Sequence, residues 1–229
     1  MTISASRPAQ PAGESLAAGQ LRIDVWGDLA CPWCYVGKNR LDQAIASSPH
    51  AGAITVVPRS FELDPAMSHD VRPNLEVLSA RYGLSLAQAR AMEDNVAALV
   101  QREGLPFAAD RVLSNSFDVH RVLHLAGTFG LADEMLGVLQ RTLFSGQASA
   151  YDHTVIADAA SHLGIPRHRA GEVLASDEYA DAVRADEAEA RRIGVTGVPF
   201  AAFGGRAAIH GATSSEGYAK AIEQAWSRR

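Results

Sequence analysis

Residues Leu21–Cys34 read LRIDVWGDLACPWC and hold the strongest structural signals in the chain. The first six alternate apolar and polar side chains, which is typical of a half-buried strand. Pro32 suits the first position of a helix, where its missing N–H costs nothing, so we expect a helix over 31–47. A second strand is expected over 53–63, in which Pro58 indicates a bulge or a sheet edge. Strand, helix and strand in this order predict a βαβ unit.

The pattern changes after the second strand. Over 73–193 the only periodicity is helical, broken by short loops that contain Gly and Pro. We expect helices over 73–82, 86–103, 116–129, 131–145, 153–163, 167–175 and 177–193. Strand character returns at 199–203 and 207–209, on either side of a Gly-Gly hairpin turn. Thr213 and Glu216, three residues apart, predict a capping box at the start of a last helix.

The length of 229 residues fits one domain with an insertion better than two full domains. We therefore expect an α/β domain built from 21–70 and 194–229, interrupted by a helical domain over 71–193. Residues 1–20 are rich in Ala, Ser, Pro and Gly and are expected to form a flexible tail. This tail holds one basic residue, Arg7, and no apolar core of a signal peptide, so a cytoplasmic location is expected.

The composition excludes several classes of protein. Hydrophobic residues make up 47% and charged residues 21%, as in an ordinary globular protein rather than a disordered or fibrous one. The net charge of −5 gives no reason to expect a nucleic-acid surface. No run of apolar residues is long enough to span a membrane, so no membrane partner is expected. Nothing in the sequence fixes the oligomeric state.

The two cysteines of the chain, Cys31 and Cys34, stand in a Cys-x-x-Cys motif. Such a pair can be redox-active, structural, or half of a zinc site. Zinc requires four ligands, and the sequence offers no second pair to complete them unless two chains share an ion, so no metal is expected. A Cys-x-x-Cys pair beside a βαβ unit favours dithiol–disulfide chemistry.

The position of the motif at a helix N-terminus assigns different roles to the two thiols. Unpaired backbone N–H groups and the helix dipole favour the thiolate form of Cys31. We therefore expect the pKa of Cys31 to lie well below the ordinary thiol value of about 8.5. Cys34 lies one helical turn deeper, within reach of Cys31 but shielded. Cys31 is thus expected to attack and Cys34 to resolve the mixed disulfide. Trp33 between them is expected to be exposed, either as a contact surface or packed over the dithiol.

These motifs together resemble the DsbA family of thioredoxin-fold oxidoreductases, most closely its FrnE-like branch, over about residues 21–226. The branch reads Cys-Pro-Trp-Cys followed by an aromatic residue, any residue, Gly and Lys. The matching segments are Asp28–Lys38, Phe61–Pro65, Asn115 with His120-Arg121, and Gly194–Phe200.

The resemblance implies a thioredoxin-like α/β fold with a large all-helical insertion. It also implies that Pro199 is cis, that its loop lies against the dithiol, and that the backbone of Val198 pairs with a substrate. Attack by Cys31 is implied as well. The residues expected to contact a substrate are Pro32, Trp33, Val198, Pro199 and His120.

The sequence departs from the wider family at one chemically important place. Many thioredoxin-fold proteins carry a buried acid six residues before the first cysteine, which accepts the proton of the second thiol. Here that residue is Val25, so the proton acceptor is unassigned. In addition, 210–213 reads HGAT where the family has Ser-Gly-Ala-Gln, and no further cysteine pair provides a second redox centre.

Two other groups of residues have simpler interpretations. His120 and His124 have the spacing of two metal ligands on one helix, but without a third ligand they are expected to be structural. His120 is also a candidate for the cleft between the two domains. The charged run 184–192 is expected to be a solvated helix face.

The predicted function is exchange of thiols and disulfides with a cysteine-containing protein or a small thiol or disulfide. Two alternatives stay open: a glutathione-dependent isomerase or transferase on the same scaffold, and a chaperone-like module whose disulfide switches its shape. Related isomerases generally lack the paired cysteines, so the presence of both favours the first function. No bound cofactor is expected, with glutathione as an optional co-substrate.

Overall fold

The computed structural model describes residues 19–228, so most of the tail expected over 1–20 lies outside the described residues. The central sheet has the strand order β2-β1-β5-β6. Its strands are β1 (Leu21–Gly27), β2 (Ile54–Ser60), β5 (Phe200–Phe203) and β6 (Ala207–His210). Strand β2 is parallel to β1, whereas β5 is antiparallel to β1 and β6 is antiparallel to β5. The second strand therefore lies at an edge of the sheet, as Pro58 indicated.

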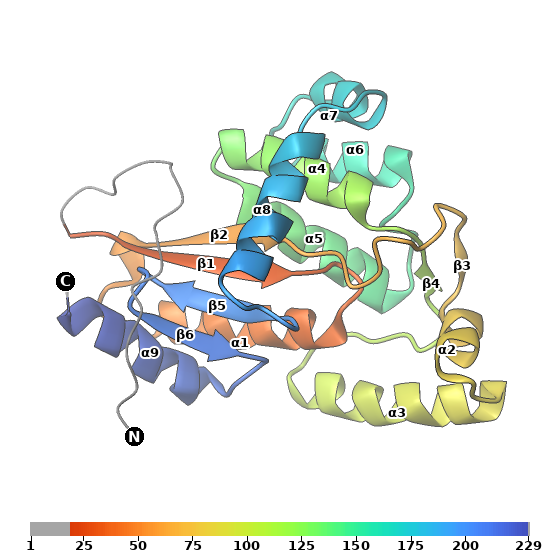
Figure 1. Ribbon diagram of the computed structural model, residues 1–229, viewed down its shortest axis with the longest axis horizontal. Coiled ribbons are helices and arrows are strands. Elements are labelled where there is room, and N and C mark those ends of the chain that lie inside the picture. The colour runs from red at the N-terminus through yellow and green to blue at the C-terminus, as the bar shows by residue number, and fades with distance from the viewer. Residues whose placement is uncertain (1–18, 229) are drawn as a thin grey trace.

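Helices α1 (Pro32–Ala46) and α9 (Ser215–Ser227) pack side by side on one face of the sheet (Figure 1). Apolar side chains from both helices and from β1 and β5 form one buried cluster between them, including Ile23, Leu41, Phe203 and Ile222. Burial of these side chains fixes the position of α1, and with it the cysteine motif, relative to the sheet.

The expected capping box at Thr213 is wrong. The N-cap of α9 is Ser214, whose hydroxyl accepts a hydrogen bond from the backbone N–H of Gly217. Thr213 and Ser214 can both cap a helix. The sequence pattern pointed to Thr213 because Glu216 stands three residues after Thr213. Glu216 instead pairs with Lys220 one turn later.

The helical insertion contains every helix predicted from the 3.6-residue period. Its helices are α2 (Asn74–Tyr82), α3 (Leu86–Arg102), α4 (Phe117–Thr128), α5 (Ala132–Ser145), α6 (His153–His162), α7 (Arg167–Leu174) and α8 (Ala180–Arg192). Two strands that the periodicity did not reveal, β3 (Arg72–Pro73) and β4 (Val112–Leu113), pair antiparallel within this segment. A two-residue strand is too short to leave a period in the sequence.

The insertion contacts the sheet at its β2 edge. Helices α4, α5 and α8 all pack against β2, and Figure 1 shows α8 crossing the sheet on the face opposite α1 and α9. A large apolar cluster fills the space between the helices and extends to Tyr35 and Val36 at the start of α1. The redox motif thus lies where the two apolar cores meet.

The charged run 184–192 is not simply a solvated helix face. Asp186 and Glu187 of α8 are buried, and Asp186 accepts hydrogen bonds from the Arg59 guanidinium at 2.9 Å and from the backbone N–H of Ser60 at 3.0 Å. Position along the helix could not reveal this contact, because it depends on the packing of α8 against β2. The run attaches the insertion to the sheet.

None of the helices within residues 19–228 combines the length and the apolarity that crossing a membrane requires.

Candidate active site

Cys31 and Cys34 occupy the start of α1 as free thiols. Cys31 is the N-cap residue, with extended backbone angles, and Pro32 follows at the first helical position. The backbone N–H groups of Cys34 and Tyr35 both donate to the Cys31 carbonyl, which closes the first turn. Trp33 has 42% of its surface exposed and is therefore available to a partner molecule.

Exposure does not distinguish the two thiols, contrary to what the helix position suggested. Cys31 is 4% exposed and Cys34 is 6% exposed. Their pKa values move in opposite directions instead. The side chain of Cys34 donates a hydrogen bond to the Cys31 sulfur and, with backbone N–H groups of the first turn, lowers the pKa of Cys31 against the effect of burial. Burial, followed by the interaction with Cys31, raises the pKa of Cys34.

The loop before β5 lies against the dithiol. The peptide bond between Val198 and Pro199 is cis, as predicted. The Cys31 sulfur lies 3.8 Å from the carbonyl oxygen of Val198, within the range of a weak S–H to oxygen hydrogen bond. Residues far apart in the sequence therefore meet at a single sulfur atom.

Two glycines permit the close packing around the cysteines. A Cβ atom on Gly37 of α1 would lie 3.1 Å from Cγ of Pro199 and 3.2 Å from the Tyr218 hydroxyl. A Cβ atom on Gly27, at the end of β1, would lie 3.3 Å from the sulfur of Cys34. At both positions a Cβ atom would require its neighbours to shift by a few tenths of an ångström, which is a physical reason for Gly three residues after Cys34.

A buried carboxylate lies next to the dithiol, although Val25 occupies the family's usual acid position. Asp28 is 3% exposed and precedes Cys31 by three residues. Its two carboxylate oxygens accept hydrogen bonds from the backbone N–H groups of Ala30 at 3.1 Å and Leu63 at 2.7 Å. Its negative charge raises the pKa of both cysteines, as a smaller contribution than those described above. The sequence motif contained Asp28, but the expected position of the acid directed attention elsewhere.

His120 of α4 reaches the same region from the helical insertion. It is 2% exposed, and its Nε2 lies 3.9 Å from an oxygen of Asp28. His124, one turn later on the same helix, lies elsewhere: its Nε2 is 3.2 Å from Asp186 and 3.2 Å from the hydroxyl of Ser60. The two histidines thus face different carboxylates rather than a common point.

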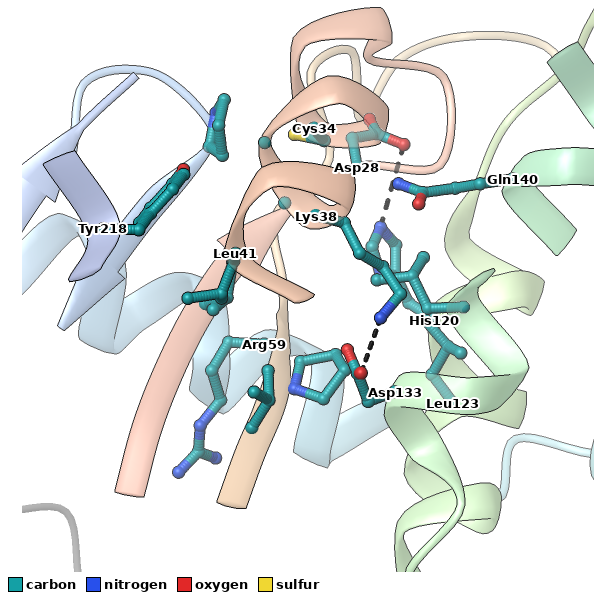
Figure 2. A pocket seen from close by; sticks show the side chains of 17 residues that line it. Asp28, Cys34, Lys38, Leu41, Arg59, His120, Leu123, Asp133, Gln140 and Tyr218 are labelled. Atoms are coloured by element: carbon teal, nitrogen blue, oxygen red, sulfur yellow. Dashed lines mark hydrogen bonds and ion pairs between the residues drawn. The ribbon is translucent and has the colours of Figure 1, made fainter. Parts of the chain in front are cut away.

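A cavity of about 30 Å³ lies behind α1, between the sheet and the insertion. Figure 2 shows Asp28 in this view between Cys34 and His120, and Gln140 of α5 lines the same cavity. On the far wall Lys38 of α1 forms an ion pair of 2.5 Å with Asp133 of α5. The lining residues with polar or titratable groups come from α1, β2, α4, α5, α9 and the loop after β1, and are Cys34, Asp28, His120, Gln140, Lys38, Asp133, Arg59 and Tyr218.

The structure has a dithiol at a helix start, a facing Pro199 loop and a helical insertion. One family model matches the stretch of chain that contains all three. The model of the DSBA-like thioredoxin domain matches residues 22–223. This chain belongs to the DSBA-like thioredoxin family.

Several solved structures are similar to this DSBA-like chain. A probable DsbA oxidoreductase from Streptomyces coelicolor has 41% identity and a TM-score of 0.84, with 92% of each chain covered. The cytosolic disulfide reductase DsbM from Pseudomonas aeruginosa has 16% identity and a TM-score of 0.57, over 90% of this chain and 96% of DsbM. A 2-hydroxychromene-2-carboxylate isomerase has 15% identity and a TM-score of 0.64, over 90% and 96% of the two chains. No match was found among curated proteins.

These similarities confirm the predicted DsbA-like family, the thioredoxin-like fold and the assignment as an oxidoreductase enzyme. In the DSBA-like chain the structure brings Cys31, Cys34, Val198 and Pro199 together and places His120 nearby across Asp28.

Proposed function

We propose that this chain is a thiol–disulfide oxidoreductase in which Cys31 attacks and Cys34 resolves. The observation that supports these roles is the opposite shift of the two pKa values at a dithiol that shares one helical turn. The thiolate is the nucleophile in disulfide exchange, so the thiol with the lowered pKa reacts first.

In the oxidation of the enzyme, the Cys31 thiolate attacks one sulfur of a substrate disulfide and releases the other as a thiolate. Cys34 then attacks the Cys31 sulfur of the mixed disulfide, which breaks the bond to the substrate and forms the internal disulfide. The enzyme loses two electrons and the substrate gains them. The reverse sequence oxidises a substrate dithiol.

The substrate class that we propose is a cysteine-containing protein or a small thiol or disulfide. The Val198 carbonyl lies beside the attacking sulfur, where a backbone group can pair with an extended peptide. The exposed Trp33, next to the helix start, offers apolar contact area to the same partner. Pro32, Trp33, Val198 and Pro199 remain the proposed contact residues, whereas His120 is buried and faces Asp28 rather than the surface.

Glutathione is a second candidate partner, proposed as a co-substrate rather than a bound cofactor. One structure of DsbM that is similar to this chain contains GSH, at 17% identity and a TM-score of 0.57. Because both cysteines are present here, we favour thiol exchange over an isomerase or transferase reaction. We also propose membership of the FrnE-like branch, the division into 21–70 with 194–229 and 71–193, and a cytoplasmic location like that of DsbM.

Trapping experiments test the roles of the two thiols. With oxidised glutathione, Cys34→Ser is expected to accumulate a stable adduct on Cys31, detected by mass spectrometry. Cys31→Ser is expected to form no adduct and to lose the reduction of insulin by dithiothreitol. An adduct in Cys31→Ser but not in Cys34→Ser would reverse the roles, and wild-type turnover without any mixed disulfide would reject the mechanism.

The direction of the reaction is tested by the reduction potential of the pair. A reduction potential of about −270 mV identifies a reductant, and one of about −120 mV identifies an oxidant. Equilibration with glutathione buffers gives this value directly. A chaperone-like module would show no catalysed insulin reduction at either potential.

A further inference from the structure

Resolution of the mixed disulfide requires Cys34 to lose its proton. Burial raises the pKa of Cys34 and disfavours the thiolate in the reduced enzyme. The residue at the usual acid position, Val25, has an aliphatic side chain that cannot take the proton. The proton of Cys34 therefore needs another acceptor near the cavity.

His120 has the properties of a proton acceptor. Within the described part of the chain, neither ring nitrogen of His120 has a hydrogen-bond partner, although the side chain is 2% exposed. The separation of 3.9 Å from Asp28 is too long for a good hydrogen bond but close enough for strong attraction to an imidazolium. A buried polar ring without hydrogen-bond partners is energetically costly and rare in native proteins, so it calls for an explanation such as a catalytic role or a bound water.

Gln140 of α5 also lacks hydrogen-bond partners. It is fully buried, and neither its amide nitrogen nor its amide oxygen has a hydrogen-bond partner among the residues that the structure describes. Gln140, His120, Asp28 and Cys34 all line the cavity of about 30 Å³ (Figure 2). Most of the lining of this cavity is apolar, but its volume is large enough for one water molecule, which needs two to four polar partners. The unpaired polar atoms of Gln140 and His120 can supply such partners.

We propose that His120, facing Asp28, accepts the proton of Cys34 through a water molecule held by Gln140 in this cavity. The inference rests on the proposed function and deepens it. His120 is a proton acceptor that acts through water, and Asp28 is a positioning residue that stabilises the imidazolium.

The proton and electron balance is as follows. The S–H bond of Cys34 breaks, and its proton moves through the water to His120, giving a thiolate and an imidazolium. The thiolate attacks the Cys31 sulfur, the bond between Cys31 and the substrate sulfur breaks, and its electron pair leaves with the substrate. The substrate thiolate then takes up one proton as His120 releases one, so the imidazole returns to its neutral form.

The surrounding charges suit this cycle. Burial lowers the pKa of His120, so the ring starts neutral but is a weaker base than an exposed imidazole. The carboxylates of Asp28, Glu187 and Asp186 favour the charged ring, whereas His124 on the same helix opposes it. The other charged groups of the cavity wall are Lys38, paired with Asp133, and Arg59, paired with Asp186 and Asp24. Among these carboxylates, Asp28 is the one that lies close to the His120 ring, 3.9 Å from its Nε2.

The test separates the two chemical steps. Reduced protein is mixed with oxidised glutathione and quenched with acid at intervals, and mass spectrometry follows the mixed disulfide and the internal disulfide across a series of pH values. The variants are His120→Gln and, as a matched control one turn along α4, His124→Gln. Formation of the mixed disulfide depends on Cys31 and therefore reports the proposed function independently.

For His120→Gln we expect unchanged formation of the mixed disulfide but closure slowed by about 10²-fold near neutral pH. The deficit should shrink as pH rises, because Cys34 then loses its proton directly to solvent. His124→Gln should close like the wild type. Wild-type closure and pH profile in His120→Gln, or an equal loss in His124→Gln, would overturn the proposal. Failure to form any mixed disulfide in the wild type would instead reject the proposed function.

The wild-type protein provides a second measurement that does not depend on folding of the variant. If His120 accepts the proton, the rate of closure of the wild-type mixed disulfide should follow the fraction of neutral His120 ring, which NMR measures on the same protein. A closure rate that does not follow this titration would contradict the inference even if His120→Gln does not fold.

Discussion

The sulfur of Cys31 lies 3.8 Å from the carbonyl oxygen of Val198, 167 positions away in the sequence. The sulfur that we propose as the nucleophile therefore lies between two elements, the start of α1 and the loop before β5. In the proposed mechanism, a substrate disulfide that reaches Cys31 also approaches the backbone of Val198, which would couple reaction to peptide recognition.

The hydrogen bond from Cys34 is the largest influence that lowers the pKa of Cys31. We expect Cys34→Ala to raise the pKa of Cys31, whereas Cys34→Ser retains a hydroxyl donor and should keep the pKa low. The pH dependence of alkylation by iodoacetamide measures both values. Equal Cys31 pKa values in the two variants would show that the backbone N–H groups alone stabilise the thiolate.

Gly37→Ala should destabilise the protein by about 1 to 2 kcal/mol, because the new Cβ meets Pro199 and Tyr218 in a packed region. The matched control is Gly171→Ala in α7. A Cβ there would meet no heavy atom within 4 Å among the described residues, so higher helix propensity should stabilise it by about 0.5 to 1 kcal/mol. Urea unfolding measures both. If Gly37→Ala were as stabilising as the control, the Pro199 loop would not be tightly packed on α1.

Asp186→Asn should destabilise the folded state by about 2 kcal/mol at neutral pH. Burial alone would raise the pKa of Asp186, but hydrogen bonds from His124 and Ser60 and the charge of Arg59 together lower it. A lowered pKa contributes stability above the unfolded value of about 3.9 and loses it as pH falls through the folded value. The difference from the wild type should therefore disappear in acid.

Thermal unfolding from neutral to acidic pH measures the effect of Asp186→Asn. Glu189→Gln serves as its control, since Glu189 lies on the same helix and pairs with the exposed Arg192 three residues later. Little change is expected for the control. A pH-independent loss of stability in Asp186→Asn would indicate that shape rather than charge is responsible.

Ser214→Ala should cost about 1 kcal/mol, because it removes the hydroxyl that caps α9. The neighbouring substitution Thr213→Ala leaves that hydrogen bond intact and should cost less. Chemical denaturation distinguishes the two. A larger loss in Thr213→Ala would restore the cap originally expected from the sequence.

The sequence predicted most of the fold because its helices are long enough to show their period. All seven expected helices of the insertion form within a few residues of their predicted ends, and the strands around the Gly204-Gly205 turn pair as expected. The strands β3 and β4 were missed because two residues carry no period. The cap of α9 was placed one residue early because two adjacent hydroxyl residues compete for it.

The candidate site was predictable where its chemistry lies in contiguous residues. The Cys31–Cys34 motif identifies the dithiol by itself, and Pro199 followed from the family resemblance. The surroundings of the thiols were less accessible. Asp28 and His120 meet across the boundary between the sheet and the insertion, and pairing of that kind depends on tertiary packing rather than on spacing. The same holds for Asp186, whose burial no helical pattern indicates.

The attachment of α8 to β2 also bears on aggregation. An edge strand can offer free N–H groups to a strand of another molecule, and β2 is an edge strand of the central sheet, partly covered by α4, α5 and α8. Pro58 has no N–H, and Ser60, two residues later on the same side of the strand, donates its N–H to Asp186. Two successive outward positions at the end of β2 therefore offer no free donor. The contact that holds the insertion in place also keeps this end of the sheet from extending into a neighbouring copy.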